Sequence, residues 1–269
     1  MTGLIREDVI STISKKRFII LTALAFAGAV VSAVITRNGH WNDLTYFFGI
    51  QKYITDYFDP LIGTALILSV YRRKFTRNSI LQVEEKGLKR SAGVLSKTVS
   101  GALILAACYL VMAVLVILLG LILGAHMSAA QTGQILLRLL LDCLAAVVIY
   151  IAALFFLYLF AFPLVPVIVY VTLMTFAVQF YHNVFGMFAN NIYLICCFID
   201  PKINADNTYT LLLLSGIRLE NILIFPVQAA VPLLLSLLVF RLKKLKPLKK
   251  DKNEPAENAV NTEVPESNA

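Results

Sequence analysis

Residues 99–124 read VSGALILAACYLVMAVLVILLGLILG and carry no charged side chain. A helix needs about 20 mostly apolar residues to cross the hydrocarbon core of a bilayer, so this stretch predicts a membrane-spanning helix. Outward from it, five further apolar stretches predict spans of the same kind: 18–35, 57–71, 135–160, 163–181 and 219–240. The sequence therefore predicts an all-α polytopic membrane protein whose transmembrane domain, residues 18–240, contains six spans.

The composition indicates the same class of protein. Hydrophobic residues make up 59% of the chain and charged residues 15%, whereas a soluble domain is about 45–50% apolar and about 25% charged. The net charge of +8 does not predict a nucleic-acid partner, because the basic residues lie beside apolar runs instead of on one face of a folded domain. We expect the chain to lie in the cell membrane, with the lipid bilayer as its surroundings.

The distribution of Lys and Arg predicts the orientation. Six spans place both termini on one side, and the three segments on that side, 1–17, 72–98 and 241–269, contain all but five of the 24 Lys and Arg residues. The other five are Arg37, Lys52, Arg138, Lys202 and Arg218. Basic residues concentrate on the cytoplasmic side of membrane proteins, so both termini are predicted to be cytoplasmic. The first apolar run is long and has no clear cleavage site after it, so we expect it to be retained.

The two terminal segments differ in character. In residues 1–17, Ile5, Val9 and Ile13 recur at i, i+4 and i+8, which predicts an amphipathic helix lying in the membrane interface. Residues 241–269 begin with the basic run RLKKLKPLKKDK, which suits contact with anionic headgroups. The remaining tail is polar and rich in Pro, Glu and Asn, and we expect it to be disordered.

The cytoplasmic loop 72–98 contains more than a topology signal. Residues 72–90 read RRKFTRNSILQVEEKGLKR, and the positive-inside rule explains the basic residues. It does not require the apolar ILQV or the acidic pair Glu84 and Glu85. Two interpretations remain: a solvated basic linker, or a segment that docks on a partner through a few apolar anchors with charged surroundings. We favour the second.

Ionisable groups inside membrane spans are functional candidates by default. Arg138 and Asp142 lie four residues apart in the fourth span, so they share a helix face and can pair. A structural pair near the outer end of that span is favoured over a substrate contact. Asp59 precedes Pro60 and is expected to start the second span. No chain of carboxylates through the membrane is evident from the sequence, which disfavours a proton- or sodium-coupled carrier.

The cysteines and the outer loops give weaker signals. Cys108 and Cys143 fall inside apolar runs and suit the role of small hydrophobic residues. No Cys or His spacing predicts a metal site, and a disulfide at Cys196 or Cys197 stays open. Two outer loops are expected, 36–56 and 182–218, and the second contains the apolar island IYLICCF, which suits a short re-entrant or interfacial helix.

The order of these parts resembles the membrane (permease) subunit of ABC transporters of the type-2 exporter class. The resemblance covers most of the chain: an amphipathic helix, a basic loop between spans two and three, and six spans ending in VFRLKK. Within KGLKRSAGVLSK, Gly87, Arg90 and Lys97 stand where the family has a glycine, an arginine and a lysine. The chain departs from the family at RRKFTRNSI, which is basic where the family often has an acidic residue, and Asn78-Ser79 stands in for the Asn-Gly-Thr-like step that follows.

The resemblance implies a function without catalysis in this chain. A separate ATPase subunit would bind and hydrolyse ATP, and a second membrane subunit, identical or paralogous, would complete the substrate pathway. Residues 1–17 would form the elbow helix. The coupling segment would be about 78–86, with its ATPase contacts formed by the residues Ile80, Leu81, Val83, Glu84, Glu85, Gly87 and Arg90.

Two alternatives stay open. The first is a channel or carrier that works without an ATPase. The second is a CAAX-type intramembrane protease, because EEKGLKR is similar to the paired-glutamate signature of that family, although the arginine comes one residue late. His182 is a poor match to the histidine that such a site needs. The sequence does not select a substrate.

Overall fold

The structure is a computed structural model that describes residues 1–38, 43–71, 75–160, 162–176, 197–215 and 219–243. Within these ranges every regular element is a helix, which confirms the all-α prediction. The bundle consists of α2 (Lys16–Asn38), α3 (Asp43–Tyr53), α4 (Asp59–Val70), α6 (Arg90–Ile122), α7 (Ala129–Phe160), α8 (Leu164–Val171), α11 (Pro201–Ser215) and α12 (Leu219–Leu242), with the π-helical turns η1 (Ile54–Phe58) and η2 (Thr172–Phe176).

Four helices are long and apolar enough to cross a membrane: Lys16–Thr36, Arg90–Ile122, Ala129–Phe160 and Asn221–Leu242. They correspond to the predicted spans 18–35, 99–124, 135–160 and 219–240. The fifth predicted span is a shorter apolar helix over its described part, Leu164–Thr175, and residues 177–181 lie outside the described residues. The structure thus supports a membrane-embedded helical bundle.

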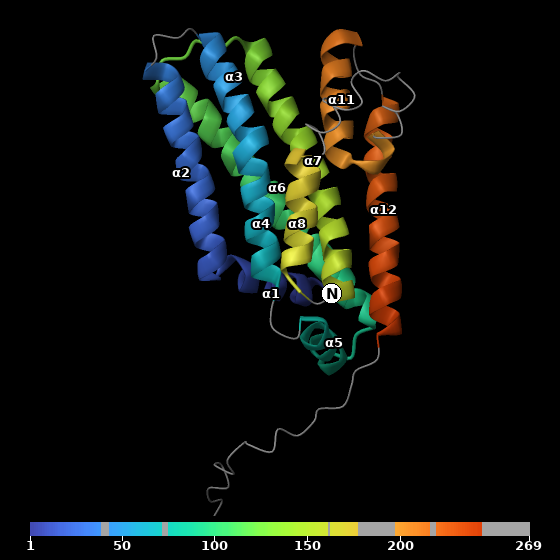
Figure 1. Ribbon diagram of the computed structural model, residues 1–269. Helices are drawn as coiled ribbons and strands as arrows, with labels where there is room; N and C mark the ends of the chain where they lie inside the picture. The colour runs from blue at the N-terminus through green and yellow to red at the C-terminus, as the bar shows by residue number, and fades with distance from the viewer. Residues whose placement is uncertain (39–42, 72–74, 161, 177–196, 216–218, 244–269) are drawn as a thin grey trace, which may run out of the picture.

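The second predicted span is part of a longer helical segment. α3, η1 and α4 follow one another without a break from Asp43 to Val70 and run side by side with α2 (Figure 1). The prediction of an outer loop over 36–56 is therefore wrong for the second half of that range, which is helical. Asp59 is the first residue of α4, as predicted, although the helical segment as a whole begins at Asp43.

The π turn η1 accommodates the proline inside this segment. Pro60 has no backbone N–H and its ring crowds the preceding helical turn. Just before it the turn widens, and the Asp59 N–H donates to the carbonyl of Ile54, five residues earlier. Wide turns of this kind are frequent at functional sites in helices. Here η1 and the start of α4 carry Thr55 and Asp59, two polar groups discussed below.

Small residues allow α2 to pack closely on α3 and α4. Ala25, Ala29 and Ala33 form one fully buried face of α2. Gly28 lies beside Tyr53, whose hydroxyl donates to the carbonyl of Ala25 at 2.6 Å. Close approach through small residues is how helices associate in lipid, where the hydrophobic effect does not drive them together.

The predicted outer loop 182–218 contains a helix in its described part. α11 begins at Pro201, and Asp200 precedes it as an N-cap whose Oδ1 accepts the Lys202 N–H at 2.8 Å. α11 packs against α7 and α12 in the half of the bundle away from α5 (Figure 1). His182 and most of the IYLICCF island lie outside the described residues, as does the tail 244–269.

Two helices lie at one end of the bundle. α1 (Thr2–Ile13) and α5 (Phe75–Glu85) are found there, together with the N-terminus and the last turn of α12 (Figure 1). The N-terminus and the last described residues after α12 thus lie at the same end of the bundle. This agrees with an even number of membrane crossings between them.

Candidate functional site

The predicted coupling segment is an amphipathic helix, α5, outside the main bundle. Its inner face carries Ile80 and Val83, each 1% exposed. Val83 packs so closely on α6 that a Cβ added to Gly93 would lie 2.8 Å from its Cγ2. Its outer face carries Leu81, which is 36% exposed, and the exposed acidic pair Glu84 and Glu85. The loop therefore contains a docked helix, and Leu81, Glu84 and Glu85 are exposed on the outer face of its described part.

The chain leaves α5 through a tight C-terminal turn. Gly87 has φ +65°, a left-handed conformation that favours glycine. Its N–H donates to the Glu84 carbonyl at 2.9 Å, and the Leu88 N–H donates to the Val83 carbonyl at 3.0 Å. These two hydrogen bonds form the Schellman motif that commonly ends a helix. Gly87 thus shapes the exit from α5.

Arg90 connects three elements at this end. Its Nη2 lies 2.9 Å from Glu84 Oε1 on α5, and its Nη1 donates to the Lys243 carbonyl just after α12 at 3.1 Å. Lys243 in turn donates to the Tyr158 carbonyl of α7 at 2.6 Å, and burial lowers the pKa of its amine. Because Arg90 is the first residue of α6, it joins α5, α6 and the end of α12.

α1 is bonded to both α5 and α6. Glu7 forms an ion pair with Lys86, which follows α5, and this hydrogen bond lowers the pKa of the Glu7 carboxyl. Asp8 accepts a hydrogen bond from Ser96 at 2.6 Å and pairs with Lys97, both on α6. α1, α5 and the start of α6 are therefore one connected unit, named here the basal unit.

The buried face of α1 is not the apolar stripe that the sequence suggested. Leu4, Asp8 and Thr12 are buried, at the same i, i+4, i+8 spacing but one residue earlier. Of the predicted stripe, Ile5 and Val9 are half-buried and Ile13 is 45% exposed. The polar Asp8 is turned inward because α6 supplies Ser96 and Lys97 as its partners. The apolar stripe is left along the flank, where a membrane interface would cover it.

The predicted coupling residues therefore divide into three groups. Ile80 and Val83 are buried in the chain itself, and Gly87 and Arg90 shape and hold the loop. Leu81, Glu84 and Glu85 remain exposed on α5. Burial of Ile80 and Val83 restricts the predicted partner contact to this outer face.

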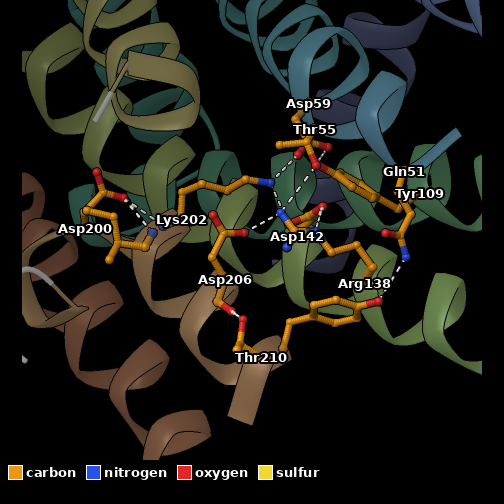
Figure 2. Close-up of polar contacts among 12 residues, drawn as sticks. Gln51, Thr55, Asp59, Tyr109, Arg138, Asp142, Asp200, Lys202, Asp206 and Thr210 are labelled. Atoms are coloured by element: carbon orange, nitrogen blue, oxygen red, sulfur yellow. Dashed lines mark hydrogen bonds and ion pairs between the residues drawn. The ribbon is translucent and has the colours of Figure 1, made fainter. Parts of the chain in front are cut away.

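A second candidate site is a buried cluster of charged side chains between α4, α7 and α11 (Figure 2). Lys202 lies at its centre, with its Nζ 2.7 Å from Asp59 Oδ2 and 2.6 Å from Asp142 Oδ1. All three side chains are fully buried. A buried charge is tolerated when it is paired and hydrogen-bonded, so this triad ties three helices together.

Arg138 extends the cluster towards the surface. Its Nε lies 2.9 Å from Asp142 Oδ2, and its Nη2 pairs with Asp206 of α11 and donates to Thr55 of η1 at 3.3 Å. The guanidinium also lies over the ring of Tyr209 at 5.4 Å. The predicted Arg138–Asp142 pair is thus confirmed, as one part of a larger network.

Two tyrosines complete the surroundings of Asp59. Tyr109 of α6 donates to Asp59 Oδ1 at 2.7 Å, and Tyr170 of α8 donates to the Asp59 backbone carbonyl at 3.5 Å. Gly63 makes room for the Tyr170 ring, since a Cβ there would lie 1.8 Å from that ring. The cluster therefore joins residues of α4, α6, α7, α8 and α11, in addition to η1.

The cluster opens on one side. Arg138 and Asp206 line a cavity of about 520 Å³ whose other polar residues include Lys52, Thr55 and Asp56. Water or a polar ligand in this cavity would reach the outer members of the network. The inner triad of Lys202, Asp59 and Asp142 is shielded from it by burial.

The cluster corrects two expectations. Lys202 was assigned to an outer loop, and it is fully buried. The sequence gives no sign of clustered carboxylates, yet Asp59, Asp142 and Asp206 lie close together inside the helical bundle. The signal for α11 was present as Asp200-Pro201, an N-cap followed by proline at the first helical position, with Lys202 and Asp206 spaced for one helix face.

The other polar candidates lie apart from both sites. Gln228 of α12 donates to the carbonyls of Cys197 and Phe198 at 2.8 and 3.2 Å, and so ties α12 to the segment that precedes α11. Glu84 and Glu85 of the protease alternative are exposed on α5, and His182 lies outside the described residues. Among the residues that the structure describes, no group of His, Cys, Asp or Glu is arranged to hold a metal ion.

The comparisons with known proteins give no assignment. No protein-family model matches the chain, and no curated protein matches it. The functional argument therefore rests on the residues and contacts described above.

Proposed function

We propose that this chain is the membrane subunit of an ATP-driven exporter, and that a separate ATPase subunit docks on the outer face of α5. A second membrane subunit, identical or paralogous, completes the substrate pathway. The observation that supports this proposal is the basal unit. A solvated linker needs neither a buried inner face nor ion pairs to its neighbours, and α5 has both.

The basal unit gives a mechanical route from α5 into the bundle. Glu7 and Lys86 join α5 to α1, and Asp8 joins α1 to α6 through Ser96 and Lys97. Arg90 joins α5 to the end of α12. A displacement of α5 by a partner therefore moves α1, α6 and α12 together, as coupling to ATP hydrolysis requires.

The outer face of α5 is the surface to test. Leu81 is its exposed apolar residue, and Leu81→Glu places a charge where a partner would cover an apolar side chain. Loss of one well-packed anchor weakens an interface by more than about tenfold. We expect the wild-type chain, tagged and isolated from its own membranes, to carry a second subunit that hydrolyses ATP and has nucleotide-binding motifs. Leu81→Glu should lose that subunit.

Ser14→Glu is the matched control, because Ser14 is exposed at the same end of the bundle but lies after α1, off α5. It should keep the ATPase. Both variants must elute as folded protein from size-exclusion chromatography. If Leu81→Glu retains the ATPase with full stoichiometry, or if no ATPase accompanies the wild-type chain, the proposal is rejected.

The buried cluster favours a second candidate, a proton-coupled carrier. Intramembrane carboxylates and basic residues mark ion pathways in such proteins, and the cavity at Arg138 gives a polar approach. This candidate predicts proton uptake by vesicles that contain the chain alone, measured with an enclosed pH dye under an imposed gradient. Uptake that Asp142→Asn abolishes supports the carrier, and no uptake above empty vesicles rejects it.

A further inference from the structure

A groove lies between the start of α6 and the last two turns of α12, with a volume of about 600 Å³. α6 contributes Lys89, Arg90 and Ser91, and α12 contributes Leu234, Leu237, Leu238 and Arg241. One end of the groove is thus basic and the other is apolar. It lies at the same end of the bundle as α5, where the candidate span of α12 ends.

The basic end is suited to an anion. Arg90 is already engaged by Glu84 and by the Lys243 carbonyl, which leaves Lys89 and Arg241 as its exposed cations. Lys89 is also the N-cap of α6 and makes no side-chain capping bond. The first turn of a helix presents unpaired backbone N–H groups and the positive end of the helix dipole, so it adds to the attraction.

The apolar end continues from the cations into the membrane part of α12. Leu234, Leu238 and Arg241 fall on one face, at i, i+4 and i+7. Leu234 is 64% exposed and Leu238 is 53% exposed. A groove with cations at the end of a candidate span and exposed leucines along it matches an amphiphile with an anionic head and an acyl chain.

We propose that this groove binds one phospholipid with an anionic headgroup. Its phosphodiester lies between Lys89 and Arg241, and one acyl chain lies along Leu234 and Leu238. Basic pockets between membrane helices on the cytoplasmic side recognise anionic headgroups in this way. A free phosphate would use only the cations and leave the leucines uncovered. The inference does not depend on the exporter proposal, since it uses residues of this chain alone.

The test compares two lipids that share their acyl chains. The chain, purified in a nonionic detergent, is titrated with dioleoylphosphatidylglycerol or dioleoylphosphatidylcholine, and retained lipid is counted by native mass spectrometry. We expect one phosphatidylglycerol to be retained more tightly than phosphatidylcholine. Each basic residue near an anionic headgroup contributes about fivefold, so Lys89→Gln with Arg241→Gln should weaken retention by about thirty-fold.

The matched control removes two cations elsewhere at the same end. Lys16→Gln with Arg17→Gln at the start of α2, both exposed, should retain the lipid like wild type. Leu234→Ser with Leu238→Ser should also lose it, although the cations remain. The inference is overturned if both lipids bind equally, if the Lys89 and Arg241 variant retains phosphatidylglycerol, or if equimolar inorganic phosphate displaces it.

Discussion

At the scale of single residues, Lys202 is the side chain whose environment matters most. An ammonium group in an apolar interior is costly unless opposite charges compensate it, and Asp59 and Asp142 do so from two different helices. Removing one partner of a buried ion pair leaves uncompensated charge behind, which costs more than the pair itself contributed. Lys202 therefore holds α11 to the bundle.

Lys202→Met is expected to lower the stability of the protein by about 3–5 kcal/mol, because two buried carboxylates lose their shared cation. Thermal unfolding in detergent, followed by tryptophan fluorescence or by aggregation, measures the loss. Lys52→Met is the control, since Lys52 is exposed, and surface substitutions usually change stability by less than about 0.5 kcal/mol.

A second substitution, added to Lys202→Met, distinguishes the effect of the unbalanced charge from the effect of the changed side-chain packing. Asp59→Asn added to Lys202→Met removes one carboxylate and leaves Arg138 to balance Asp142. This double variant should unfold at a higher temperature than Lys202→Met alone. An equal or lower unfolding temperature would show that the ion pairs do not carry the effect.

At the scale of elements, the basal unit depends on contacts between short helices that have little hydrophobic core of their own. α1 and α5 have 12 and 11 residues, and isolated helices of this length are marginal in water. Their order comes from the bundle and from each other. The ion pair between Glu7 of α1 and Lys86, directly after α5, links them.

This link makes α1 sensitive to acid. The Lys86 hydrogen bond lowers the pKa of Glu7, so the pair stabilises the folded protein above the ordinary carboxyl pKa. The contribution disappears as pH falls through the lowered pKa. Glu7→Gln should therefore lower the unfolding temperature by a few degrees at most at neutral pH, and this difference should close in acid.

Lys86→Gln is the matched variant for the same pair. Its unfolding temperature should differ from that of wild type with the same pH dependence. The double variant with Glu7→Gln should unfold at a temperature no lower than that of either single variant. A difference between wild type and Glu7→Gln that stays constant from neutral to acidic pH would contradict the assignment.

Also at this scale, the segment from Asp43 to Val70 shows why the apolar pattern predicted a span that begins only at residue 57, although the helical segment begins at Asp43. Polar residues such as Lys52 and Asp56 interrupt the apolar run, and Pro60 marks a break in most helices. Tyr46, Phe47 and Ile50 nevertheless place an apolar face on the core, with the periodicity of a helix. The π turn then lets the chain pass the proline without ending the helical segment.

At the scale of the whole molecule, α1, α5 and the C-terminal end of α12 lie at one end of the bundle (Figure 1), and the sequence segments around them contain most of the Lys and Arg residues. From the positive-inside rule we expect this end to face the cytoplasm. The turn between α6 and α7 lies at the other end of the bundle, with Ala130 exposed at the start of α7. These two ends are expected on opposite sides of the membrane.

Cysteine labelling tests this orientation. In a background without the native cysteines, Ala130→Cys should react with a membrane-impermeant maleimide in intact cells. Ser14→Cys, exposed after α1, should react only after permeabilisation. Labelling of both positions in intact cells, or the reverse pattern, would show that the assigned orientation is wrong.

The sequence by itself determined the class of the protein and the positions of its long apolar helices, because about 20 apolar residues in a row have few other stable environments. It also determined the Arg138–Asp142 pair, since residues four apart on a helix are neighbours by geometry alone. Only the tertiary structure decided that Lys202 and Asp59 join this pair and that Asp8 and Val83 face inward. These contacts link residues far apart in the chain, and which face of a short helix is buried depends on the partners that the folded bundle supplies.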